Sequence, residues 1–68
     1  MGAMKQMIDE LIEKKAQGNN FQMMNIKMKL MLKGVMVERI TDETPNDNEV
    51  MNLIQEVARD FQVVLSKS

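Results

Sequence analysis

The sequence predicts an all-α fold, a small unit of three helices, from three observations. Apolar residues recur at helical spacing in three stretches, a glycine follows each of the first two, and a proline-containing start signal precedes the third. With 68 residues the chain forms one domain at most, and such a chain buries only about 60% of its unfolded surface. Disulfides, a structural metal or association usually compensate for so small a core. Because the chain has no cysteine and no histidine, we expect oligomerisation to complete the unit.

The first predicted helix covers residues 4–17. Its apolar residues recur at steps of three and four, as in a helix with one buried face, at Met4, Met7, Ile8, Leu11 and Ile12. Glu10 stands four positions before Lys14, which is the favourable orientation for an ion pair along a helix. Residues 1–3 are interpreted as a remnant of cloning ahead of a natural start, so residues 4–68 make up the expected helical domain.

The second predicted helix covers residues 20–33 and ends at Gly34, where glycine can adopt the left-handed conformation of a helix terminus. Gly18 ends the first helix in the same way, and either Asn19 or Asn20 can cap the second. A connection this short is typical of two helices packed antiparallel. The two stretches therefore predict a helical hairpin.

The second helix is apolar on two opposite sides. At about 100° per residue, the longer side contains Phe21, Met24, Met28, Met31 and Leu32. The opposite, shorter patch contains Met23, Ile26 and Leu30. A helix that is apolar nearly all round is normally buried, so either both other helices pack on it or a second chain covers the rest. We expect the longer side to meet the third helix, of this chain or of a partner, and the shorter patch to meet the first helix.

Residues 35–44 leave three alternatives open: a short strand, a turn of helix, or a loop with anchored apolar side chains. The third helix is predicted over residues 45–65, with Thr44 as N-cap, Pro45 at the first helical position and an acid, Asp47, at the third. Steps of four and three give it a heptad-spaced face of Val50, Ile54, Val57, Phe61 and Val64. Such a face can pack at a shallow angle on a helix of the same chain or of another.

Composition argues against several functions. Without cysteine, histidine or tyrosine, and with serines only at positions 66 and 68, we expect no enzyme, no metal site and no cofactor. The acidic run 41–49 lacks the glycine of a calcium-binding loop, so its acids are interpreted as helix caps. No segment is apolar enough to span a membrane, and we expect a cytoplasmic protein.

The nine methionines are the strongest compositional anomaly. Methionine fills irregular gaps in cores, which is one interpretation, and it also forms adaptable binding surfaces, which is another. A third interpretation, capture of a soft metal by thioethers, has no cysteine or histidine to support it.

These patterns predict a non-enzymatic protein–protein interaction module, a dimerisation or docking domain within a larger regulatory protein, with a homodimer as the expected assembly. The residues expected to bind the partner are Phe21, Met23, Met24, Ile26, Met28, Leu30, Met31, Ile54, Val57 and Phe61. The alternative is a small nucleic-acid-binding regulator, since short helical domains include helix-turn-helix proteins. It is disfavoured because the net charge is −1, and because Arg39 falls in a loop and Arg59 stands beside Asp60.

Overall fold

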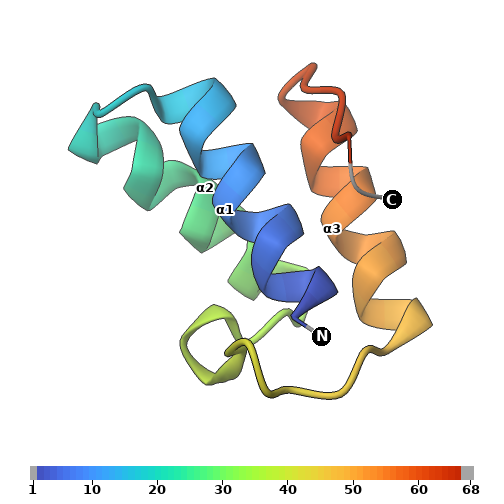
Figure 1. The fold of residues 1–68 in the computed structure, drawn as a ribbon. Coiled ribbons are helices and arrows are strands. Elements are labelled where there is room, and N and C mark those ends of the chain that lie inside the picture. Colours follow the sequence, from blue (N-terminus) through green and yellow to red (C-terminus); the bar gives the residue numbers. More distant parts are fainter. Residues whose placement is uncertain (1, 67–68) are drawn as a thin grey trace.

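A computed structural model describes residues 2–66 and confirms the all-α prediction. Its elements are α1 (Ala3–Ala16), α2 (Asn20–Leu32), a short 3₁₀ helix η1 (Val37–Arg39) and α3 (Asn48–Asp60). Figure 1 shows α1 and α2 as an antiparallel hairpin, with α3 running in the same direction as α1 on its other side. The segment that holds η1 passes below the helices and carries the chain from the end of α2 to the start of α3. Each of the three long helices contacts the other two.

The predicted hairpin turn is present between α1 and α2. Gln17 and Gly18 both adopt left-handed conformations, with φ of 49° and 86°, and these reverse the chain. Asn19 is the cap of α2, because its side-chain oxygen accepts hydrogen bonds from the backbone N–H groups of Phe21 at 2.9 Å and Gln22 at 3.1 Å. The polar side chain of Asn19 thus satisfies two donors that the first turn of α2 leaves free.

Gly34 ends α2 as predicted. Its φ is 95°, its N–H donates to the carbonyl of Met31, and the N–H of Val35 donates to the carbonyl of Leu30 at 2.9 Å. This is the paired hydrogen-bond pattern of a Schellman motif, which needs a left-handed residue after the helix. The motif turns Val35, which is fully buried, back into the core.

The connection between α2 and α3 adopts the helical-turn alternative, as η1. Thr44 belongs to this connection, since its hydroxyl accepts a hydrogen bond from the N–H of Thr41 at 2.8 Å and donates to the carbonyl of Arg39 at 3.3 Å. The prediction that Thr44 caps the third helix is therefore wrong. Asp47 is the cap instead, accepting from the N–H of Glu49 at 2.9 Å, so α3 begins three residues later than the proline signal indicated.

α3 also ends earlier than the predicted residue 65. Gln62 takes a left-handed conformation with φ 60°, and the N–H of Val63 donates to the carbonyl of Ala58 at 2.8 Å. This is a second Schellman motif, with glutamine where glycine usually stands. The chain then folds back along α1, which brings Leu65 into the core at 7% exposure. No glycine stands at this turn, so the spacing of apolar residues predicts a helix that continues to residue 65.

The core lies between the three helices and closes with side chains from the connecting segments. Each of the three long helices contributes one face to it. The largest fully buried side chains are those of Met7, Leu11, Ile26, Leu30, Val35, Ile54 and Val57. The ion pair predicted along α1 is present, with Lys14 Nζ 2.9 Å from a carboxylate oxygen of Glu10. The core uses one side of α2, and this leaves the other side of that helix at the surface.

Candidate protein-interaction surface

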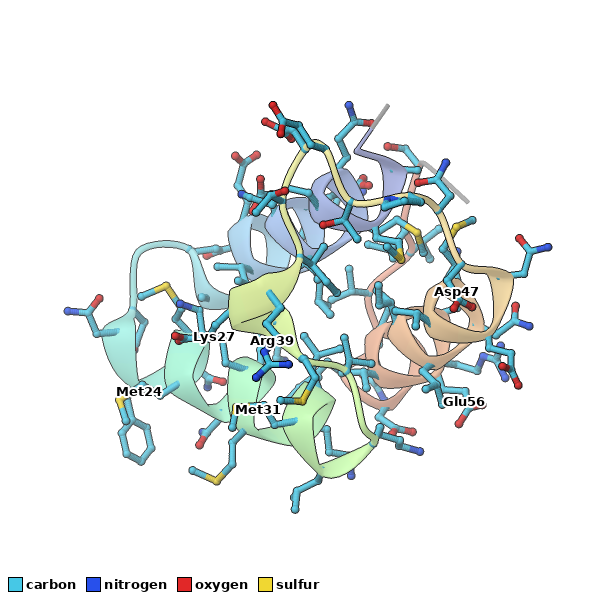
Figure 2. The ribbon with its side chains drawn as sticks, turned by 90° about the horizontal axis from the view of Figure 1, so that it is seen from below. Met24, Lys27, Met31, Arg39, Asp47 and Glu56 are labelled. Carbon is cyan, nitrogen blue, oxygen red and sulfur yellow. The ribbon has the colours of Figure 1, made fainter. Side chains whose placement is uncertain are left out.

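Five large apolar side chains form one exposed face on α2, which we call the outer face. Its members and their exposed fractions are Phe21 (73%), Met24 (60%), Met28 (55%), Met31 (54%) and Leu32 (79%). Figure 2 shows Met24 on the outside of α2, on the far side of that helix from α3. Met36, just beyond the end of α2, is exposed as well, at 51%. So much apolar area on one helix is more than the scattered single residues that a monomer surface normally shows.

The residues predicted to bind a partner divide into two groups. Phe21, Met24, Met28 and Met31 are the exposed ones. The core of the single chain holds Ile26, Leu30, Ile54 and Val57, each with no exposed surface, while Met23 and Phe61 are half-buried against that core. The four fully buried residues cannot contact a partner while the domain stays folded, so they are not part of the candidate surface.

The expected partners of the two sides of α2 are corrected accordingly. Within the chain, α3 does not cover the longer side. Both α1 and α3 pack on α2 through the core that contains Ile26 and Leu30. When three short helices surround one core, each helix has only one side that faces the core. Both α1 and α3 therefore contact α2 on the side of the shorter patch.

The wheel pattern already placed Leu32 beside Phe21, although Leu32 was not among the predicted binding residues. With 79% of its surface exposed it is the most exposed member of the outer face. The helical wheel indicates that Leu32 lies on the same side as Phe21. Heptad spacing includes only residues 21, 24, 28 and 31, so it does not include Leu32.

Charged residues border the outer face on both sides. On the side of α3, Lys33 pairs with Glu56 at 3.2 Å and Lys29 approaches Asp60 at 3.9 Å; we call this the α3 edge. On the opposite side Lys27 of α2 lines a groove with Val37 and Glu38 of η1, and Arg39 is the last residue of η1 (labelled in Figure 2); we call this the η1 edge. Within residues 2–66, neither cation of the η1 edge has a carboxylate oxygen within 4 Å. The α3 edge therefore carries two cations and two anions. The η1 edge carries two cations and one anion, Glu38, which lines the same groove as Lys27, so its net charge is +1.

A shallow groove adjoins the η1 edge. It has a volume of about 680 Å³, runs between α1, α2 and η1, and includes apolar side chains such as Ile12, Met23 and Val37. Its rim carries charges of both signs, among them Lys27 and Glu38. Because it is open and its polar groups do not converge on one point, the groove resembles the margin of an interface more than a pocket for a small molecule.

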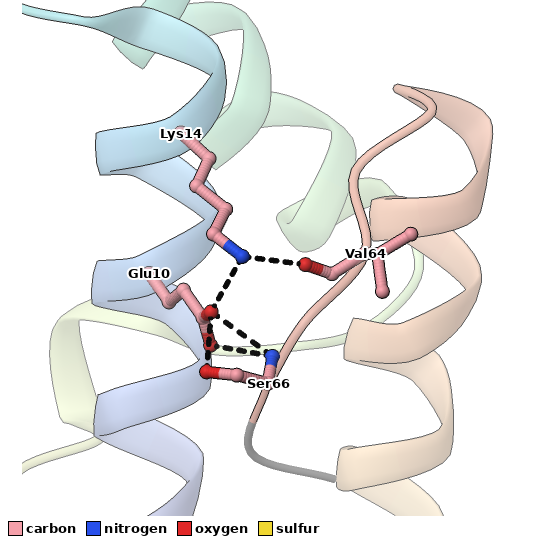
Figure 3. A network of polar contacts seen from close by, with 4 residues as sticks. All are labelled: Glu10, Lys14, Val64 and Ser66. Atoms are coloured by element: carbon pink, nitrogen blue, oxygen red, sulfur yellow. Dashed lines mark hydrogen bonds and ion pairs between the residues drawn. The ribbon is translucent and has the colours of Figure 1, made fainter.

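A polar network fastens the segment after α3 to α1 (Figure 3). The Glu10 carboxylate accepts hydrogen bonds from the backbone N–H of Ser66 at 2.9 Å and from its hydroxyl at 2.7 Å, and Lys14 donates to the carbonyl of Val64 at 2.8 Å. The hydrogen bond from Lys14, followed by those from Ser66, lowers the pKa of Glu10 from its ordinary 4.5 to about 2. These contacts hold the residues on both sides of Leu65 against α1 and so keep Leu65 in the core. We therefore assign the network a structural role.

Among residues 2–66, no three side chains of the metal-ligating types converge. None of the described helices combines the length and the hydrophobicity that a bilayer crossing requires.

Comparisons with protein-family models, curated proteins and solved structures gave no significant match. The outer face of α2 is the candidate functional site.

Proposed function

We propose that this chain is a non-enzymatic protein–protein interaction module that forms a homodimer through the outer face of α2. The observation that carries the proposal is the continuous exposure of five large apolar side chains on one helix of a domain whose core is already closed. Burial of apolar surface is the main favourable term in most protein associations. A helix that exposes such a face gains that free energy only when another surface covers it.

The chemistry of the face suits association. Three of its five members are methionines, whose unbranched and polarisable side chains adapt to the shape of an opposing surface. Phe21 adds an aromatic anchor, a residue type that is enriched at the centres of interfaces. The methionine anomaly thus has two explanations in one chain, because Met4 and Met7 fill the core while Met24, Met28 and Met31 are exposed.

The nucleic-acid alternative finds less support in the geometry. Phosphate binding needs cations that are free to replace counterions. Lys29 and Lys33 point instead to carboxylates of α3, at 3.9 and 3.2 Å. The cations that border the outer face without an ion pair are Lys27 and Arg39, and they lie beside a strongly apolar face, which is a poor match for a polyanion.

Light scattering over a dilution series, with wild type, Met28→Lys and Val64→Lys compared, tests the proposal. Met28 is central in the outer face, and Val64, 83% exposed, lies after α3 beside the tail network. Both substitutions add one charge at an exposed site, so neither should unfold the chain. We expect wild type and Val64→Lys to form dimers and Met28→Lys to stay a folded monomer by circular dichroism. A wild-type chain that is a folded monomer up to about 100 μM would refute the proposal, because association would then be worth less than about 5.5 kcal/mol.

A further inference from the structure

We infer that, in this dimer, the two copies of α2 lie side by side and parallel, with the η1 edge of each copy facing the α3 edge of the other. The inference rests on the proposed function, that the outer face of α2 mediates self-association, and adds the geometry and the charges that select the partner. Three observations carry it: the area of the face, the spacing of its residues and the different charges of its two edges.

The area matches what one half of a homodimer interface requires. Five side chains that are half to four-fifths exposed offer about 600 Å² of apolar surface, taking roughly 100 to 150 Å² for each. A standard interface buries about 800 Å² per partner, and homodimer interfaces are about 65% apolar. The outer face therefore supplies the apolar part of such an interface, and the flanking polar edges supply the rest.

The spacing suits a helix of the same kind as the partner. Phe21, Met24, Met28 and Met31 follow one another at steps of three, four and three, which is the heptad pattern. Two helices with this pattern pack at a shallow angle, each side chain fitting between those of the facing helix. A second copy of α2 presents the same series, so the two faces interlock along their whole length.

The charges of the edges select the parallel direction. In a two-fold dimer with parallel helices, the η1 edge of one copy lies opposite the α3 edge of the other. Lys27 and Arg39 then face the edge that carries Glu56 and Asp60. With antiparallel helices each edge lies opposite its own copy, so the two η1 edges face each other, each with a net charge of +1 from Lys27, Arg39 and Glu38. Exposed charges interact over about 10 Å at moderate ionic strength, so this difference favours the parallel dimer.

Single-cysteine cross-linking tests the direction, because the chain has no cysteine of its own. The variants are Met24→Cys and Met31→Cys, each at an exposed site. In the parallel dimer each position meets its own copy, so each variant alone should form a disulfide dimer under mild oxidation. In the antiparallel dimer the two copies of residue 24 would be separated by about 10 Å along the helix, beyond the roughly 7 Å between Cα atoms that a disulfide spans.

Val64→Cys is the matched control, since it is exposed but lies outside the outer face. At micromolar concentration, pairing inside a dimer should make Met24→Cys and Met31→Cys oxidise to dimers on the order of 100-fold faster than Val64→Cys. A fast reaction only in the mixture of Met24→Cys with Met31→Cys would show an antiparallel dimer, which overturns the inference and leaves the proposed function standing. Light scattering that shows a dimer while all three variants react slowly would place the interface elsewhere and overturn both.

Discussion

The Glu10 carboxylate accepts hydrogen bonds from both the hydroxyl and the backbone N–H of Ser66, at 2.7 and 2.9 Å, across 56 positions of sequence. These contacts close the domain, since they hold the segment after α3 against α1 and keep Leu65 in the core (Figure 3). The sequence predicted that Glu10 pairs with Lys14, but its second partner depends on how the chain turns after Asp60.

Acid should weaken this closure in a defined pH range. The pKa of Glu10 is lowered from 4.5 to about 2, so its ionised form is favoured by folding. The stabilisation is fully present above about pH 4.5 and disappears as the pH falls through about 2. Thermal melts of wild type and Glu10→Gln should show a lower Tm for the variant at pH 7 and a difference that shrinks between these pH values. A Tm difference that stays constant down to pH 2 would contradict the role assigned to the carboxylate.

Truncation should destabilise the chain strongly at one residue of α2 and hardly at all at another residue close to it. Ile26 is fully buried, so Ile26→Ala should lower the free energy of unfolding by about 2 to 4 kcal/mol. Met28 is 55% exposed, so Met28→Ala should change it by less than about 0.5 kcal/mol when the chain is dilute enough to be monomeric. Urea unfolding checks both values. Equal losses at the two positions would mean that the outer face is packed inside the monomer.

The two Schellman turns offer a matched pair of backbone substitutions. Gly34 has φ 95°, and a Cβ added there meets no atom of the described chain within 4 Å, so Gly34→Ala should cost about 1 to 2 kcal/mol through backbone conformation alone. Gln62 has φ 60° at the equivalent position, and Gln62→Gly should stabilise the fold by up to about 1 kcal/mol. Urea denaturation of each variant measures the effect. Opposite signs are the expected outcome, and a loss of stability in both would argue against the turn after α3.

Asp47 should matter to α3 as its cap. Asp47→Ala removes the acceptor of the Glu49 and Val50 N–H groups and should cost about 1 kcal/mol, whereas Asp47→Asn should retain most of the stability. The helical signal in circular dichroism, followed during thermal unfolding, compares the two variants. If Asp47→Ala were as stable as wild type, the start of α3 would not depend on this side chain.

Methionine oxidation should report the state of the outer face. Hydrogen peroxide transfers one oxygen to a thioether and leaves water, and exposed sulfur atoms react first. In a dilute solution of the protein, the exposed methionines should oxidise well before Met7, which is 1% exposed; these are Met24, Met28 and Met31. At concentrations where the dimer forms these three should become protected, as peptide mass spectrometry can measure. In Met28→Lys, Met24 and Met31 should stay reactive at every concentration.

The helical hairpin could be predicted because its signals are local. Asn19 and Gly34 act within one turn of α2, and the spacing of apolar residues in α1 records one buried face. The limits of α3 could not be predicted, because they depend on competing contacts. Thr44 accepts a hydrogen bond from Thr41 in a turn and does not cap a helix. Gln62 takes a left-handed conformation, which glutamine as a residue type does not predict.

The two apolar sides of α2 follow directly from the order of its residues at 100° per residue. Which of the two sides is internal depends on how the three helices pack together. α1 and α3 both pack on the side of Ile26 and Leu30, because a core shared by three short helices reaches only one face of each. The other side therefore remains at the surface, with Phe21, Met24, Met28 and Met31 exposed. Burying these side chains would favour association with another surface.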